Sequence, residues 1–388
     1  MTKSILISGW RGIPHSYAMV NQYQCLELQR REDVQLYFED RPFADPTWQK
    51  VSGIFSEDEE IAIAGIPPCP DGVVPDAELR IAFPFDLVSP PRAACTAVFG
   101  TSEYKAVPPA HVAHKTPLER AHRLHDGSMM IVTPSEWSRE GFVRSGADAR
   151  RVAVIPHGVD PTSFRPPTTI ERSNAREKYK VGEKEFVFLN VGAMTGNKKV
   201  EMILNGFASV LRTKPTAKLV LKGMDALYPS KKMFMTTALQ TLSAEDAQLA
   251  LPRVVYIGGS LASHEMRHLY HAADCYVSPY SAEGFNLPVL EAAACGLPSI
   301  CTGGGPTDEF TTEDFTMRIR SEAVSNELDG EVATSLRPDQ AHLIRLMNRI
   351  VDDDDFRTTA REAAPAHVNA HFTWRHAVDK LLALFFPL

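Results

Sequence analysis

Two glutamates in one short stretch of the sequence are the residues best suited to chemistry. Glu283 and Glu291 lie eight positions apart within residues 281–298. Pro288 predicts the first turn of a short helix that ends before Gly296. We expect Glu283 on the loop before this helix and Glu291 in its first turn, so that both carboxylates border one pocket. Because carboxylates accept hydrogen bonds from paired hydroxyls, the pair suits a ribose and a hexose.

The backbone between these glutamates is suited to a diphosphate that would join the two sugars. Gly284 lets a ligand approach the main chain closely, and the N–H groups of residues 285–287 fall at a helix N-terminus, which favours phosphate. A simpler interpretation stays open, because acidic residues near a helix start are common and mildly stabilising.

The elements that must position these residues are two parallel α/β sheets. Short apolar runs alternate with helical stretches in both halves, a pattern typical of strands joined by crossover helices. At 388 residues the chain suits two domains, and the Pro- and Gly-rich residues 156–167 predict the linker. The predicted strands are 5–8, 34–38, 80–83, 96–99, 130–133 and 152–155 in the first half, and 186–191, 218–221, 254–257, 275–278 and 299–302 in the second.

Two further local signals concern a helix start and an unassigned loop. Thr133 followed by Pro134 and, three positions on, Glu136 predicts a helix capped by Thr133. Residues 43–76 show no clear period and are left without an assigned element.

Composition excludes several classes of protein. A net charge of −7 argues against a nucleic-acid binder, and six cysteines without a C-x-x-C pair predict reduced structural thiols. No apolar run approaches the ~20 residues of a membrane span, and no leader peptide is visible. We therefore expect a cytoplasmic protein, with peripheral contact at the inner face of the membrane left open by the basic Arg144, Arg150 and Arg151.

Several motifs together carry a resemblance to a known family. The stretch from Glu283 to Glu291 resembles the E-x7-E signature of retaining GT-B glycosyltransferases, in particular glycosyltransferase family 4. The resemblance covers residues from about 130 to the C-terminus. The other matching segments are residues 133–139, residues 155–160 with Phe164 and Pro166, the spacing of Phe207, Gly223 and residues 255–258, and residues 372–374.

The resemblance implies a fold and a reaction. The fold class would be α/β, a GT-B fold with two Rossmann-like domains facing across a cleft. Residues 1–160 would form the acceptor-side domain, residues 161–370 the nucleotide-sugar donor domain, and residues 371–388 a helix packing back on the first domain. The protein would transfer a hexose from a nucleoside-diphosphate sugar to an acceptor hydroxyl with retention, without a cofactor or an essential metal. The acceptor would be a glycan, a lipid-linked sugar or a small molecule.

The resemblance also assigns roles in the donor domain. Glu291 would hold the ribose, Glu283 would hold the sugar hydroxyls near the reacting carbon, and Lys198 would neutralise the diphosphate. Lys199 competes with Lys198 for this role. Lys198 is favoured because the helix that follows, up to Phe207, then keeps the register of the family. The other donor-binding candidates are Gly258 and the backbone of Gly284, Phe285, Asn286 and Leu287.

One position departs from the family pattern. Many members carry an arginine directly after the Val-Gly pair, but here Ala193 follows Gly192. Lys222 is the candidate that compensates for this missing charge. Otherwise the leaving group is held less tightly, and the departure keeps open a non-catalytic subunit that only binds the donor. A separate alternative with the same fold is a GT-B epimerase or hydrolase that needs no acceptor.

The N-terminal half offers fewer candidates. Gly12, in the loop after the first predicted strand, would let the donor approach the backbone across the cleft. His15, at the start of a helix predicted over residues 16–31, and Ser102 with Glu103 are candidates for the acceptor side. An ordinary helix-start histidine and an ordinary strand-to-helix loop explain these residues equally well.

Overall fold

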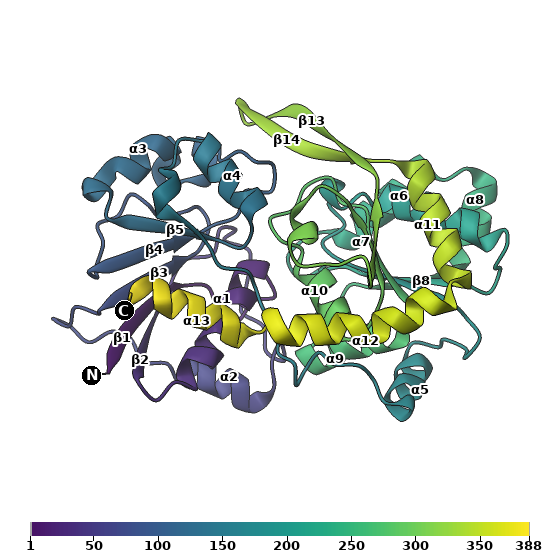
Figure 1. The fold of residues 1–388 in the computed structure, drawn as a ribbon, viewed down its shortest axis with the longest axis horizontal. Helices are drawn as coiled ribbons and strands as arrows, with labels where there is room; N and C mark the ends of the chain where they lie inside the picture. The colour runs from purple at the N-terminus through teal and green to yellow at the C-terminus, as the bar shows by residue number, and fades with distance from the viewer. Residues whose placement is uncertain (1, 388) are drawn as a thin grey trace. The chain divides into compact units, whose positions relative to one another are not determined.

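The protein divides into two compact units in a computed structural model, which describes residues 2–387 (Figure 1). Unit 1 runs to Gly158 and also takes in Ser325–Ser335 and the chain from Trp374 onward, while unit 2 comprises Val159–Val324 and Leu336–Thr373. The sequence analysis placed the boundaries after residues 160 and 370. Met1 and Leu388, the outer ends of the expected N-terminal domain and closing helix, lie outside the described residues.

Unit 1 is built on a parallel sheet of six strands in the order β2-β1-β3-β4-β5-β6. At the centre of β1, Ile5 and Ile7 are fully buried because helices cover both faces of the sheet. The strands are β1 (Lys3–Gly9), β2 (Val34–Asp40), β3 (Ala77–Ile81), β4 (Cys95–Phe99), β5 (Met129–Thr133) and β6 (Val152–Val154).

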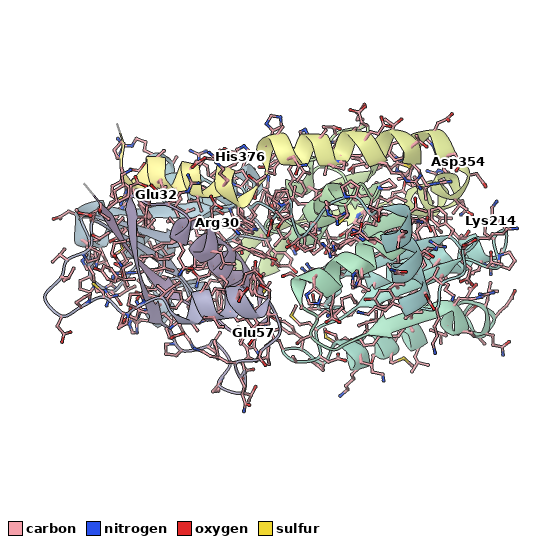
Figure 2. The ribbon with its side chains drawn as sticks, turned by 90° about the horizontal axis from the view of Figure 1, so that it is seen from below. Arg30, Glu32, Glu57, Lys214, Asp354 and His376 are labelled. Atoms are coloured by element: carbon pink, nitrogen blue, oxygen red, sulfur yellow. The ribbon has the colours of Figure 1, made fainter. Side chains whose placement is uncertain are left out.

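The helices of unit 1 include two that are far apart in the sequence and lie side by side. In Figure 1, α1 (Ser16–Gln29) runs beside α13 (Trp374–Phe385). The Trp374 ring stacks on Tyr23 at 5.2 Å, and Arg31 forms an ion pair with Asp379 at 2.8 Å. Figure 2 labels Arg30 just after α1, Glu57 at the start of α2 and His376 in α13. The remaining helices are α2 (Glu57–Ala64), α3 (Leu118–Arg123) and α4 (Glu136–Arg144).

Unit 2 repeats the same construction with the strand order β12-β11-β10-β7-β8-β9. Its strands are β7 (Val187–Val191), β8 (Lys218–Lys222), β9 (Val254–Ile257), β10 (Cys275–Ser278), β11 (Ser299–Thr302) and β12 (Thr316–Ile319). Its helices are α5 (Thr169–Lys178), α6 (Val200–Leu211), α7 (Ser230–Thr241), α8 (Ala244–Ala250), α9 (Ser263–Ala272), α10 (Leu287–Ala294), α11 (Gln340–Asp352) and α12 (Asp354–His371).

Short 3₁₀ turns connect several of these elements. They are Pro109–His111, Ala113–Lys115, Leu124–Gly127 and Ala149–Arg151 in unit 1, and Gly196–Lys198, Leu251–Arg253 and Pro306–Glu309 in unit 2.

A hairpin that the sequence analysis did not predict connects β12 to α11. It consists of β13 (Ser321–Leu328) and β14 (Glu331–Pro338). Asp329 and Gly330 form its turn with φ values of 50° and 85°, as two-residue hairpin turns require. Within unit 1, the Thr334 N–H donates to the carbonyl of Tyr104 at 2.7 Å. Arg144 donates to the Thr334 hydroxyl at 3.0 Å.

The structure confirms ten of the eleven predicted strands to within two residues at each end and corrects the other. The predicted strand over residues 80–83 is placed too late in the sequence. The strand β3 occupies Ala77–Ile81, where every residue is buried between β1 and β4. The chain leaves the sheet before Pro84, which has no N–H to donate to a ladder.

The predicted cap of α4 is also wrong. Thr133 ends β5 and pairs with Val154, so it is committed to the sheet. Ser135 caps the helix instead, because its hydroxyl accepts the N–H of Ser138 at 3.1 Å.

Candidate functional site

The loop between β10 and α10 carries most of the predicted donor residues. Asn286 precedes α10 in the left-handed conformation, with φ 80°, which asparagine tolerates better than most residues. Its side-chain amide donates to the Ser278 hydroxyl at 3.0 Å. The Phe285 ring stacks on Phe310 with centroids 4.5 Å apart. These contacts fix the backbone of residues 284–287 at the N-terminus of α10.

One detail of this loop differs from the prediction. The helix begins at Leu287 rather than Pro288, so Glu291 is its fifth residue and lies in the second turn instead of the first. The left-handed Asn286 starts the helix one residue early, with Pro288 at the second helical position.

Lys198 and Glu283 meet although they are 85 residues apart in the sequence. The Lys198 ammonium donates to the Glu283 carboxylate and forms an ion pair with it. The side chain of Glu283 is only 7% exposed and that of Lys198 is 22% exposed. A charge pair with so little exposure is screened weakly by solvent, so each group strongly orients the other.

The backbone around Lys198 explains why this lysine makes the contact. Lys198 ends the Gly196–Lys198 turn after β7. The backbone carbonyl of Asn197 accepts the N–H of Ser281 at 2.8 Å. The side-chain amide of Asn197 donates to the Ala282 carbonyl at 3.0 Å. The turn is therefore fastened to the loop that carries Glu283.

Lys199, the competing candidate, lies in a different environment. It caps α6 with φ 53°, and its ammonium pairs with Glu201 at 3.5 Å. The structure thus brings Lys198 to Glu283 and places the ammonium of Lys199 beside another acid.

Glu291 is held by a tyrosine that the sequence analysis missed. The buried Tyr270 of α9 donates its hydroxyl to Glu291 at 2.6 Å. Burial raises the pKa of Glu291 to about 7, and the tyrosine hydrogen bond only partly offsets this effect. A buried tyrosine hydroxyl needs a partner, but nothing in the sequence indicates which one.

The charges of Glu283 and Glu291 both act on the phenol of Tyr276 in the sheet. Tyr276 in β10 is fully buried, and its hydroxyl donates to the Val191 carbonyl at 3.2 Å. Burial raises the pKa of Tyr276 well above its ordinary value, and the negative charges of Glu283 and Glu291 add to this effect. That the two carboxylates border one pocket stays a prediction.

Lys222, the candidate for the missing arginine, ends β8 and is 5% exposed. Its ammonium donates to the carbonyl of Gly223. Burial lowers the pKa of Lys222 to about 8, against the opposing effect of Asp225. Its backbone lies beside the Val-Gly pair, because the N–H of Gly192 donates to its carbonyl at 2.9 Å.

Gly258 follows β9 in a crowded position. A Cβ at this residue would overlap the carboxylate of Asp225, which accepts the Tyr256 hydroxyl at 2.8 Å. Packing alone therefore explains a glycine here, and its role in donor binding stays a prediction.

The candidates of unit 1 follow the carboxyl ends of β1 and β4. Gly12 has φ 77°, and its N–H donates to the Gln22 side chain at 2.8 Å. His15 caps α1 by accepting the N–H of Tyr17 at 3.2 Å. Burial lowers the pKa of His15 to about 4, so the imidazole is neutral.

Ser102 and Glu103 take part in the packing of their own loop. The buried Ser102 hydroxyl donates to the Ala106 carbonyl at 2.9 Å, and the Glu103 carbonyl accepts the Trp137 indole N–H at 2.9 Å. The side chain of Glu103 is half-buried. Their assignment to the acceptor side stays a prediction.

Residues 2–387 contain neither a cluster of metal-ligating side chains nor a membrane-spanning helix. This part of the chain contains no group of three or more His, Cys, Asp or Glu side chains placed to hold a metal ion. None of its helices combines the length and the apolar character needed to cross a membrane.

Comparisons with known proteins identify the family. The family described as "Glycosyl transferases group 1" matches residues 171–367, about half of the chain. A D-inositol 3-phosphate glycosyltransferase of Pseudarthrobacter chlorophenolicus is 29% identical over 185 residues, which cover 47% of this chain and 42% of that protein. The chain thus spans less than half the length of this curated relative.

Solved structures establish the fold. HepE of Anabaena in complex with UDP aligns with a TM-score of 0.69 and 16% identity over 100% of both chains. WaaG, a glycosyltransferase involved in lipopolysaccharide biosynthesis, aligns with a TM-score of 0.65 and 14% identity over 99% of this chain and 100% of its own. The two parallel six-stranded α/β sheets are those of the GT-B fold, which confirms the predicted fold class. This chain is therefore a member of the group 1 glycosyl transferases, glycosyltransferase family 4.

Proposed function

We propose that this protein transfers a hexose from a nucleoside-diphosphate sugar to an acceptor hydroxyl, with retention of configuration, in the assembly of a glycan, polysaccharide or glycolipid. The observation that carries the proposal is the ion pair between Lys198 and Glu283, beside the N-terminus of α10. Family membership supports the reaction class, and the UDP bound to HepE supports a uridine nucleotide as the first donor to test.

The chemistry of the step fits these groups. The bond between the sugar C1 and the β-phosphate oxygen breaks, and its electron pair stays on the diphosphate. The acceptor oxygen bonds to C1 from the same face, and its proton passes to the leaving phosphate. The Lys198 ammonium and the N–H groups at the start of α10 stabilise the charge that develops on the diphosphate. In this proposal no metal ion is needed for that charge.

In this proposal Glu283 and Glu291 bind opposite ends of the donor. Glu283 accepts hydrogen bonds from the sugar hydroxyls, and Glu291 accepts them from the ribose. Two carboxylates beside a diphosphate repel it, so the placement of Lys198 against Glu283 reduces that repulsion as well as activating the leaving group.

The pH dependence of donor binding tests the role of Glu291. Its pKa of about 7 lies above the ordinary 4.5, so it is protonated at pH 6 and ionised at pH 8. Because the ionised form accepts the ribose hydroxyls best, the Kd for UDP should fall about tenfold from pH 6 to pH 8. Because the pKa of Glu291 is raised on folding, the protonated carboxyl stabilises the folded protein below about pH 4.5, and this stability is lost as the pH rises from there through about 7. Calorimetric titration measures the affinity.

A Glu291→Gln variant is the control for the titration of the nucleotide itself. It should bind UDP more weakly and keep only the pH dependence that the phosphate contributes. Identical pH profiles for the native protein and this variant would contradict the assignment.

A product analysis separates the proposal from its rivals. The protein is incubated with UDP-glucose and GDP-mannose, with and without a panel of glycoside acceptors, and the anomeric protons are followed by NMR. The proposal predicts an acceptor-dependent product with the anomeric configuration of the donor. An inverted product contradicts retention, equal turnover without acceptor indicates a hydrolase or epimerase, and binding without any turnover indicates a donor-binding subunit.

A further inference from the structure

Four aromatic side chains gather where β1 and β2 end in unit 1. We call Trp10, His15, Phe43 and Trp48 the aromatic platform. The buried Trp10 lies at its centre, with ring centroids 5.1 Å from His15, 6.2 Å from Phe43 and 5.9 Å from Trp48, each near edge-on. The Trp10 indole N–H donates to the Pro42 carbonyl at 2.8 Å. His15 and Trp48 lie 5.1 Å apart and are inclined by only 37°.

The platform differs from an ordinary hydrophobic core in its exposure. Trp10 is fully buried, but His15, Phe43 and Trp48 are each half-buried. They come from the two loops at the carboxyl edge of the sheet, where open α/β sheets bind their ligands. The partly exposed rings therefore lie where a ligand of unit 1 is expected.

Backbone hydrogen bonds hold the two loops together. The N–H of Arg41 donates to the Gly9 carbonyl at 2.9 Å, and the N–H of Val51 donates to the Gly12 carbonyl at 2.7 Å. A Cβ on Gly12 would lie 3.2 Å from the Lys50 side chain. The rings are thus positioned before any ligand binds, which lowers the entropy cost of binding.

Polar groups adjoin the platform. Asp40, the last residue of β2, pairs with Arg11 at 2.9 Å and with Lys50 at 3.0 Å. The side chain of Asp40 is 43% exposed and that of Lys50 is 54% exposed. The side chain of Arg11 is only 17% exposed and also donates to the Ile63 carbonyl at 2.7 Å. The loops that carry the rings thus present one exposed acceptor, Asp40, and one exposed donor, Lys50, and the net charge of the three groups is only +1.

We propose that the aromatic platform binds a pyranose ring of the acceptor, with Trp48 as the main stacking residue, so that the acceptor is a carbohydrate rather than a simple alcohol. This inference rests on the proposed function. The C–H groups on one face of a pyranose pack on the π face of an indole. The hydroxyls at the ring edge require donors and acceptors, which Lys50 and Asp40 provide.

The experiment measures binding of neutral sugars to the full-length protein by saturation-transfer NMR. The probes are the methyl glycosides of glucose, galactose, mannose and N-acetylglucosamine, with n-butanol as the simple alcohol. The native protein should saturate the C–H protons of at least one glycoside and not those of butanol. Trp48→Ala should weaken that glycoside about tenfold, whereas Trp48→Phe, which keeps a ring, should stay within about threefold.

The matched control is Tyr37→Ala, which removes a half-buried aromatic from the middle of β2. It should leave glycoside binding unchanged, and each variant must keep the thermal shift that a nucleoside diphosphate gives the native protein. Equal glycoside binding by Trp48→Ala and the native protein overturns the proposal, as does an equal loss in Tyr37→Ala. If no glycoside binds while the nucleotide still stabilises the protein, the platform proposal fails and the proposed function stands.

Discussion

Replacing Lys198 by alanine is expected to lower kcat by about 10²–10³-fold, the effect of removing one preorganised group that stabilises charge in a transition state. Lys198 is fixed against the buried Glu283 by a turn that is bonded to Ser281 and Ala282. Its charge is therefore in place before the diphosphate leaves, and water cannot replace it without reorganisation. Single-turnover measurements with the best donor and acceptor give the rate of the chemical step.

Lys199 provides the control for this experiment. Lys199→Ala removes the same charge from the next residue, but its partner is Glu201 at the start of α6. We expect its kcat to stay within about threefold of the native value, since an ion pair with about a third of each side chain exposed contributes little. Equal losses in the two variants would show that the lysines act through general charge or local folding rather than through the position of Lys198.

Replacing Glu283 by glutamine is expected to lower kcat about 10²-fold without weakening the affinity for the bare nucleoside diphosphate. The amide keeps the volume of the side chain but loses the charge, which weakens its hydrogen bonds to sugar hydroxyls and to Lys198. The nucleoside diphosphate has no sugar at this end and does not use Glu283 in the proposed arrangement. Steady-state kinetics and calorimetry measure the two effects separately.

Glu201→Gln is the corresponding control, because it neutralises the carboxylate beside Lys199. It should change neither kcat nor nucleotide affinity. If Glu283→Gln retains native kcat, Glu283 does not hold the transferred sugar. If it loses nucleotide affinity as strongly as kcat, its role lies in binding the diphosphate end.

The sequence predicted the two sheets for a clear physical reason. Strands buried on both faces are short apolar runs, and eleven of these were assigned before the structure. The twelfth strand, β12, has the sequence Thr-Met-Arg-Ile. Its two polar residues interrupt the apolar run by which the other strands were predicted. The resemblance favoured Lys198 over Lys199, and the contact of Lys198 with Glu283 is consistent with that choice. The role of Lys198 in donor binding stays a prediction.

The missed elements depend on local signals or on tertiary contacts. Ser56 and Glu59 form a capping box at the start of α2, a signal that the sequence contains but that the surrounding polar loop obscured. Asp329 and Gly330 likewise predict the turn of the β13–β14 hairpin. The partnership of Tyr270 with Glu291 has no local signal, because it joins two helices through the fold.

Thermal stabilisation by nucleotides shows whether Glu291 belongs to a donor site. The melting temperatures of the native protein and of Glu291→Ala are compared with UDP, GDP and ADP and with their glucose or mannose conjugates, because a ligand that binds the folded state raises its stability. Our account predicts a rise of several degrees with one base, at about 100 times the Kd, and a much smaller rise in Glu291→Ala. No shift with any nucleotide, or equal shifts in both proteins, would contradict the assignment of the donor site.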